Sequence, residues 1–99
     1  MFIEESLYAY NPTEMNKLAD WLTENGIEFT RRPLYGGEQI ICEDWGWDAI
    51  CHNWSYGGNS GLLETMGAIV DIKSVGDEVE GCLTAEEVIE RVKRLMENS

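Results

Sequence analysis

The sequence predicts an α+β fold in which two or three helices pack on one face of a small three-stranded antiparallel sheet. Two segments carry capping residues and apolar side chains at helical spacing. They are residues 12–25 and the residues that follow 84. Between them, residues 27–52 contain three short runs of strand-forming residues separated by turn residues. The 99 residues contain no internal repeat or low-complexity tract, so we expect a single globular domain over residues 1–99.

The first expected element is a helix over residues 12–25. Asn11 is a favourable N-cap, Pro12 falls at the first helical position, where its missing N–H is harmless, and Glu14 falls at N3 of a capping box. Gly26 suits the position just after the helix. The apolar side chains that repeat at helical spacing are Met15, Leu18, Ala19 and Leu22. Residues 1–10, before this helix, fit either an edge strand or a segment that lies across the core.

Three antiparallel strands are expected next, and they are residues 27–31, 38–44 and 47–52. Pro33 and the Gly36-Gly37 pair end the first strand, and Trp45-Gly46 is expected to form a tight turn between the other two. Side chains on a strand alternate between its two faces. An even-numbered loop therefore places Cys42 and Cys51 on the same face of this hairpin.

The segment after residue 60 is expected to be a helix over roughly 61–70. The apolar residues with the helical spacing are Leu62, Leu63, Met66, Ile69 and Val70. Gly67 weakens such a helix by about 1 kcal/mol relative to alanine, so the alternative is a short helix followed by a strand at 68–73. Residues 74–83 contain two glycines between acidic residues and are expected to be a connecting loop.

The last expected element is a helix that begins after Thr84. Thr84 is its N-cap, and Glu87 completes a capping box. Glu87 with Arg91 and Glu90 with Arg94 have the i, i+4 spacing of stabilising ion pairs. The apolar stripe of this helix consists of Val88, Ile89, Val92, Leu95 and Met96.

The charge of the chain limits its partners. Nineteen acidic and seven basic residues give a formal net charge of −12. This charge repels the phosphate backbone of nucleic acids, which bind to basic patches. It also disfavours an anionic membrane surface. We therefore expect neither nucleic acid nor membrane as a direct partner.

The amino-terminal residues lack the basic and long apolar regions of a signal peptide, and no window approaches the length of a membrane span. Three cysteines without C-x-x-C spacing favour reduced thiols over a disulfide framework. These observations predict a soluble protein in the cytoplasm.

No catalytic or metal-binding residue is expected. Cys51 and His52 would be a thiol and its base, but adjacent residues of a strand point to opposite faces. The three cysteines and His52 offer no chelating pair for zinc. We therefore predict a protein that is not an enzyme and has no cofactor, in which Cys51 is a core thiol.

The glycine-rich residues 56–61 are an alternative site. They come before a predicted helix, and a loop of backbone N–H groups at a helix N-terminus can bind anions. The loop lacks the lysine of a P-loop and the G-x-G-x-x-G spacing. A small-ligand-binding protein or an enzyme that uses this loop with His52 is therefore an alternative interpretation.

Four aromatic residues cluster around the second hairpin and the loop that follows it: Trp45, Trp47, Trp54 and Tyr56. Tryptophan and tyrosine are enriched at the energetically dominant positions of protein interfaces. If the hairpin tip and the loop lie on one edge of the sheet, these rings form an apolar patch beside acidic residues. The competing interpretation is that they close the small core from its open side.

The second half of the chain contains distinctive strings. They are Trp-Asp-Ala-Ile-Cys-His at 47–52, Ser-Tyr-Gly-Gly at 55–58, Gly-Leu-Leu-Glu at 61–64 with Met66-Gly67, and Val-Glu-Gly-Cys-Leu-Thr-Ala-Glu-Glu-Val-Ile at 79–89. These strings resemble a family of small acidic proteins of unknown function from phages and prophages of Gram-positive bacteria. The resemblance implies a small accessory protein in the cytoplasm of a bacterial host cell. The family's motifs carry no known mechanism, so the resemblance transfers no functional residue.

Charge and resemblance together predict a non-enzymatic module that binds a basic host or phage protein. The most specific form of this prediction is an anti-CRISPR or related anti-defence inhibitor. Such an inhibitor mimics the charge of nucleic acid and binds a nucleic-acid-binding host defence protein. The expected contact residues are Glu43, Asp44, Trp45, Asp48, Trp54 and Tyr56. A homodimeric structural or assembly module is a further alternative.

Overall fold

The computed structural model describes residues 10–53, 55, 58–70 and 79–98. Two helices and five strands lie within these residues. The helices are α2 (Thr13–Glu24) and α3 (Ala85–Glu97), and the strands are β1 (Thr30–Leu34), β2 (Gly37–Cys42), β3 (Trp47–Cys51), β4 (Leu63–Gly67) and β5 (Val79–Leu83). The described residues also form two single 3-10 turns, η1 (Glu43–Trp45) and η2 (Gly58–Ser60). The alternatives for residues 1–10 concern a segment that lies almost entirely outside the described part.

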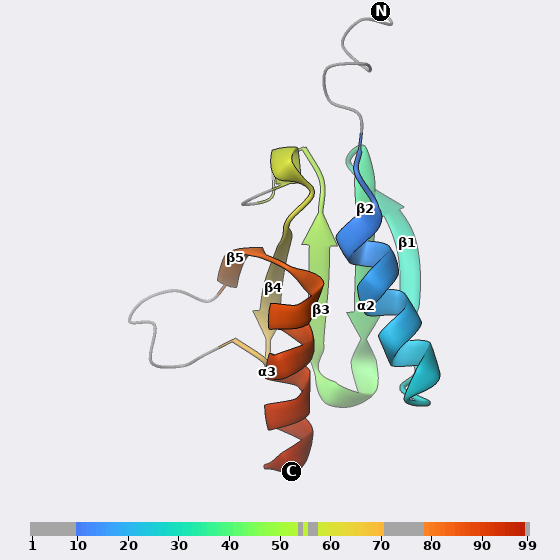
Figure 1. The fold of residues 1–99 in the computed structure, drawn as a ribbon, viewed down its shortest axis with the longest axis vertical. Helices are drawn as coiled ribbons and strands as arrows, with labels where there is room; N and C mark the ends of the chain where they lie inside the picture. Colours follow the sequence, from blue (N-terminus) through green and yellow to red (C-terminus); the bar gives the residue numbers. More distant parts are fainter. Residues whose placement is uncertain (1–9, 54, 56–57, 71–78, 99) are drawn as a thin grey trace, which may run out of the picture.

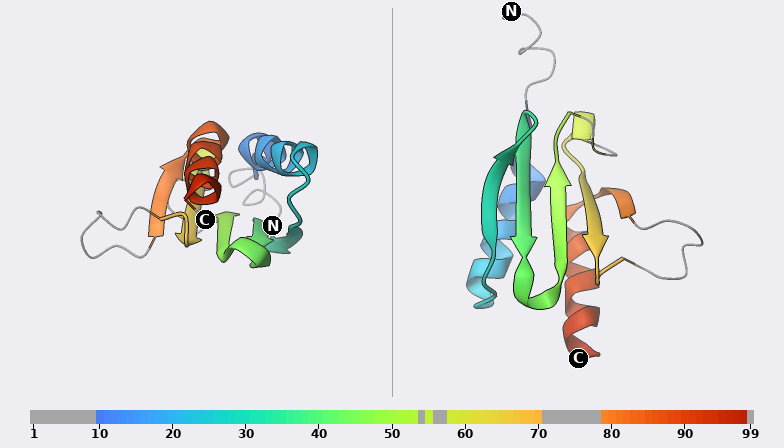
Figure 2. Two further views of the ribbon diagram at one scale, coloured as in Figure 1. Left: turned by 90° about the horizontal axis from the view of Figure 1, so that it is seen from below. Right: turned by 180° about the vertical axis from the view of Figure 1, so that it is seen from behind.

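The strands form one antiparallel meander in the order β1-β2-β3-β4-β5 (Figure 1). Helices α2 and α3 lie side by side on one face of this sheet, as the end-on view in Figure 2 shows. The predicted α+β class with helices on one face is confirmed. The predicted sheet of three strands is too small, because the described residues form five.

The core lies between the two helices and the sheet. Its buried apolar side chains come from α2, α3 and the inward positions of the strands: Met15, Leu18, Leu22, Ile40, Cys42, Trp47, Ala49, Cys51, Leu63, Leu83, Val88 and Val92. Cys42 and Cys51 both belong to this core, which confirms that they share a face of the β2–β3 hairpin.

The amino-terminal end of α2 differs from the expected capping box. Pro12 is the N-cap residue, and the Oδ1 atom of Asn11 accepts hydrogen bonds from the Thr13 N–H at 3.1 Å and the Thr13 hydroxyl at 2.7 Å. Glu14 accepts a hydrogen bond from the backbone N–H of Ala85 at 2.7 Å. The first turn of α2 therefore satisfies a backbone donor at the beginning of α3, which couples the two helices.

Helix α3 begins as predicted. Thr84 and Glu87 form the complete capping box. Because the Glu87 carboxylate accepts the Thr84 N–H, Arg91 reaches β5 and binds the Glu80 carboxylate through two N–H groups at 2.8 and 3.0 Å. The expected Glu87–Arg91 carboxylate pair is therefore wrong, and on Glu87 it is the backbone carbonyl that accepts a hydrogen bond from Arg91, at 2.9 Å.

Within residues 61–70, Leu63–Gly67 form strand β4, so the expected helix and the short helix of its alternative are wrong. Residues 68–70 form a turn and a bend, and the remainder of the alternative's strand at 68–73 lies outside the described residues. Leu63 and Thr65 face the core, and their apolar run has no period that separates a short strand from a helix. Gly67 has φ +99°, and a Cβ at this position would collide with the carbonyl oxygen of Gly46. Glycine is required here because β4 ends against the turn before β3.

The two edge strands, β1 and β5, also differ from the sequence-based expectation. Strand β1 runs through Pro33, which was expected to end it. Proline is tolerated there because an edge strand leaves some backbone N–H groups unpaired. Residues 79–83, expected to belong to a loop, form β5 by pairing with β4. That pairing is non-local, so the acidic and glycine-rich residues of this segment gave no local strand signal.

Candidate functional site

The face of the sheet turned away from the helices is open in the described part of the chain, as the view from behind in Figure 2 shows. The strand register places one row of outward side chains across all five strands: Thr30, Ile41, Asp48, Met66 and Val79. A second row contains Arg32, Gln39, Ile50 and Glu64, and Glu64 is buried, with 8% exposure. Antiparallel sheets often leave one face in water, and that face is normally polar.

This open face is partly apolar. Ile41 and Ile50 are half-buried, and the side chain of Met66 is 45% exposed. The three residues lie on the adjacent strands β2, β3 and β4. In the first row Asp48 separates Ile41 from Met66, so apolar side chains and a carboxylate alternate across this face. We call Ile41, Ile50, Met66 and Val79 the apolar band.

Two shallow hollows lie at the end of the open face next to the η1 turn. One has a volume of about 170 Å³ and is lined by Glu28, Phe29, Thr30, Ile41, Glu43 and Asp44. The other has a volume of about 260 Å³, and its lining includes Gln39, Ile41, Glu43 and Asp48. Ile41 and Glu43 line both, so the two hollows adjoin each other around one apolar side chain and one carboxylate.

Four carboxylates border these hollows, and we call Glu28, Glu43, Asp44 and Asp48 the turn-end carboxylates. The ion pairs among the described residues are Lys17–Glu14, Arg31–Glu38 and Arg91–Glu80. None of them includes a turn-end carboxylate. The negative charge at this end of the sheet is therefore not neutralised by a described basic side chain.

A short hydrogen-bond chain crosses the open face. The amide of Gln39 donates to Asp48 Oδ2 at 3.0 Å, and its oxygen accepts from Arg32 Nε at 2.7 Å. The neutral amide therefore separates the guanidinium from the carboxylate. It also holds the Asp48 side chain in place beside the second hollow.

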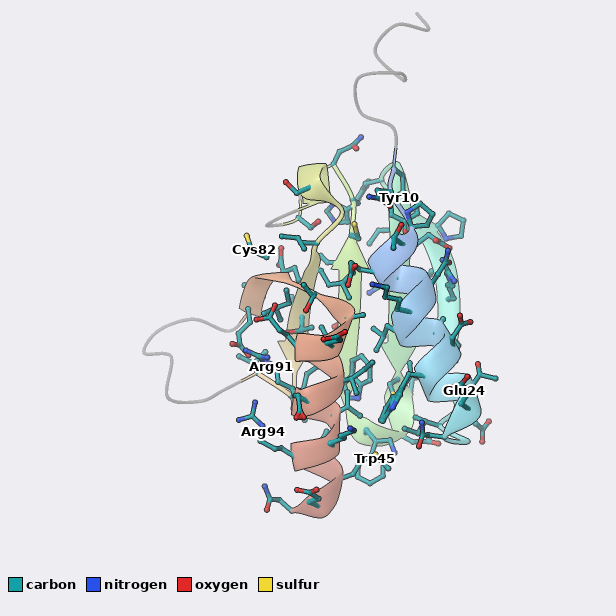
Figure 3. All side chains as sticks on the ribbon, in the orientation of Figure 1. Tyr10, Glu24, Trp45, Cys82, Arg91 and Arg94 are labelled. Carbon is teal, nitrogen blue, oxygen red and sulfur yellow. The ribbon has the colours of Figure 1, made fainter. Side chains whose placement is uncertain are left out.

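The predicted contact residues divide into three groups. Glu43, Asp44 and Asp48 lie together at the η1 end of the open face. Trp45 is half-buried and packs against the core, at the end of the sheet where both helices end (Figure 3). Trp54 and Tyr56 lie outside the described residues.

Trp47, the remaining aromatic residue of the predicted cluster, is a core side chain with 3% exposure. Trp47 therefore follows the competing interpretation, in which the rings close the core. Trp45 packs against the core while keeping part of its surface exposed, so its role as a contact residue stays a prediction.

Sequence reasoning missed Glu28 and the apolar band. The run Ile40-Ile41-Cys42 is continuously apolar, so it does not indicate which of its residues face outward. The sequence predicts a helix around Met66 and a loop at Val79. Local periodicity could not have found them, because the apolar residues Leu63 and Met66 are three residues apart, which is a helical spacing.

Cys51 and His52 do not form a nucleophile–base pair. Cys51 is fully buried in the core, and burial raises the pKa of its thiol, with a smaller contribution from the Glu38 carboxylate. The His52 ring instead lies edge-on to Tyr35, with the ring centroids 5.4 Å apart. A thiol with a raised pKa is a poor nucleophile.

The glycine-rich loop does not lead into a helix. Gly58–Ser60 form the η2 turn, and strand β4 follows it. The anion site expected from a loop at a helix N-terminus therefore lacks its helix, while Tyr56 and Gly57 lie outside the described residues. The described histidine, cysteine, aspartate and glutamate side chains form no group of three or more that could hold a metal ion.

A separate polar cluster lies on the helix side of β1 and β2. Arg31 forms a bidentate pair with Glu38, at 2.6 and 2.8 Å, and donates to Asn16 of α2 at 2.7 Å. The Tyr10 hydroxyl donates to the same carboxylate at 2.9 Å. The Arg31 hydrogen bond is the main cause that lowers the pKa of Glu38, whereas burial is the main cause that raises the pKa of Tyr10. Through the Arg31–Asn16 hydrogen bond, this cluster connects α2 to strands β1 and β2.

In comparisons with known proteins, no family model, curated protein or solved structure matches the chain. Neither α2 nor α3, the helices of the described part, is long and apolar enough to cross a membrane.

Proposed function

We propose that this protein is a non-enzymatic protein-binding module that engages a basic surface of another protein through the turn-end carboxylates. One observation carries the proposal. Four carboxylates border two adjoining hollows, and none of them takes part in an ion pair of the described residues.

The physical argument is electrostatic. Like charges held close together repel, and a lysine- or arginine-rich surface removes that repulsion when it binds. The net charge of −12 adds a long-range attraction that accelerates encounter with a basic partner. Both contributions weaken as salt screens the charges.

The resemblance to small acidic phage proteins extends the proposal to a class of partner. In a bacterial host, a nucleic-acid-binding defence protein presents a basic groove, and carboxylates can occupy such a groove in place of phosphates. We therefore propose an anti-CRISPR or other anti-defence inhibitor as the specific form of this module.

The test is capture of proteins from a bacterial host lysate by the tagged protein and two triple variants. The first variant carries Glu43→Gln, Asp44→Asn and Asp48→Asn. The matched control carries Glu86→Gln, Glu90→Gln and Glu97→Gln, which removes the same number of charges from exposed positions of α3.

We expect the wild type and the α3 control to retain the same basic nucleic-acid-binding protein. The turn-end variant is expected to lose it, and about 0.5 M NaCl is expected to release it. Equal capture of that protein by the turn-end variant would contradict the proposal.

A further inference from the structure

We infer that the partner docks an amphipathic, basic α-helix across the strands of the open sheet face. The apolar side chains of that helix contact the apolar band, and its basic flank faces the turn-end carboxylates. This inference rests on the proposed function and specifies which structural element of the basic partner is bound.

The geometry of the apolar band favours a helix that crosses the strands. Ile41, Met66 and Val79 lie in the first outward row, on β2, β4 and β5, and Asp48 occupies that row on β3. Ile50 lies on β3 in the second row. Neighbouring strands are about 4.8 Å apart, and one turn of an α-helix rises about 5.4 Å. Side chains one turn apart on a crossing helix would therefore meet side chains on successive strands. The band spans about 14 Å, which corresponds to roughly three helical turns.

The positions of the acidic side chains indicate which side chains the partner helix must carry. Glu28, Glu43 and Asp44 line the hollow at the η1 end, on one side of the apolar band. Asp48 lies in the first outward row of the sheet, between Ile41 and Met66. A helix that fits this pattern is apolar on the face toward the sheet and carries lysine or arginine on the flank toward η1. Recognition of an amphipathic helix through its apolar face is a common mode of protein binding.

Other ways of covering this surface fit less well. A partner strand added to either edge, β1 or β5, would extend the sheet and leave its open face uncovered, and at β1 it would also meet Pro33, which has no N–H to donate. A second copy of the chain would bring the same carboxylates to the interface, and the described rows of the open face supply only Arg32 as a basic side chain. Charge complementarity therefore selects a basic helix of another protein.

The test uses two synthetic, fluorescently labelled peptides of about 14 residues, both made of leucine and lysine in equal proportions. In one, the leucines follow an i, i+3, i+4, i+7 pattern and form one helical face. In the other, the same residues are scrambled so that no helical face is apolar. Binding to the full chain is measured by fluorescence anisotropy at low salt.

We expect the wild-type protein to bind the amphipathic peptide at least about tenfold more tightly than the scrambled one. The double variant Ile41→Thr, Ile50→Thr keeps β-branched residues and the charge of the protein. It is expected to reduce this preference to less than about threefold, without a change in affinity for the scrambled peptide. Leu34→Thr, at the end of β1 and outside the band, is the matched control and should keep the preference.

Each remaining outcome has a distinct meaning. Equal affinity of the wild type for both peptides would overturn the helix inference and leave the proposed function standing. Binding of the scrambled peptide that survives Glu43→Gln, Asp44→Asn and Asp48→Asn would overturn the proposed function itself. Sedimentation that shows a dimer of the wild type, dissociated by Ile50→Thr, would make a second copy the occupant. Circular dichroism of each variant establishes that it is folded.

Discussion

Two buried side chains carry polar atoms that no described residue satisfies, Trp47 Nε1 and Thr65 Oγ1. Thr65 is fully buried on the inner face of β4, where the strand register places it beside Ala49 and Glu80. A buried hydroxyl without a hydrogen bond costs about 1–3 kcal/mol. At the scale of single residues, the sheet interior is therefore not optimised for stability.

Replacement of Thr65 by valine keeps the shape and the β-branch and removes the hydroxyl. We expect Thr65→Val to raise the free energy of unfolding by about 1 kcal/mol in urea denaturation. The control Thr65→Ser keeps the hydroxyl, removes the methyl group and is expected to lower stability. A Thr65→Val protein no more stable than the wild type would indicate that the hydroxyl has a partner.

The Arg31–Glu38 pair makes stability depend on pH. The pKa of Glu38 is lowered in the folded protein, mainly by its hydrogen bonds from Arg31. The folded state therefore binds the Glu38 proton less tightly than the unfolded chain does, in which a glutamate has a pKa of about 4.3. The stabilisation is present above about pH 4.3 and is lost as the pH falls through the folded-state pKa.

Glu38→Gln removes this effect. We expect it to lower the free energy of unfolding by about 2 kcal/mol at pH 7 and to reduce the loss of stability below about pH 4.3. The measurement is urea denaturation across the acid range. The control Glu24→Gln, at the end of α2 and outside the described ion pairs, should leave stability at pH 7 unchanged. An unaltered acid limb in Glu38→Gln would refute the assignment.

At the scale of elements, the helices were predictable because their signals are local. Thr84 and Glu87 are three residues apart and define the beginning of α3 by themselves. Strands β4 and β5 were not predictable in the same way. Leu63–Gly67 form a strand by pairing with β3 and β5, and Val79–Leu83 form one by pairing with β4, and no local pattern records that pairing.

The local signal of α3 has a measurable energy. Thr84→Ala removes the hydroxyl that accepts the Glu87 N–H and should lower the free energy of unfolding by about 1 kcal/mol. Thr23→Ala, at an exposed position near the end of α2, is the control and should be neutral or slightly stabilising. If the two substitutions have equal effects on thermal stability, the capping box does not contribute as proposed.

At the scale of the whole molecule, the chain combines an open sheet face with an excess of negative charge. The acidic half of the candidate site was predictable, because Glu43, Asp44 and Asp48 flank a turn signal. The apolar half was not, because Ile41 and Met66 join the same row, on either side of Asp48, only through the register of three strands. Both halves are needed for a surface that distinguishes a basic helix from a merely basic chain.

The central claim is that the turn-end carboxylates, rather than the net charge, bind a basic partner. It is tested most directly by the affinity of labelled octalysine for the wild type and the two triple variants at low salt. We predict that Glu43→Gln, Asp44→Asn, Asp48→Asn weakens binding at least about tenfold. The equally charged Glu86→Gln, Glu90→Gln, Glu97→Gln protein should bind within about twofold of the wild type. Equal weakening in both variants would contradict the claim, because binding would then follow net charge alone.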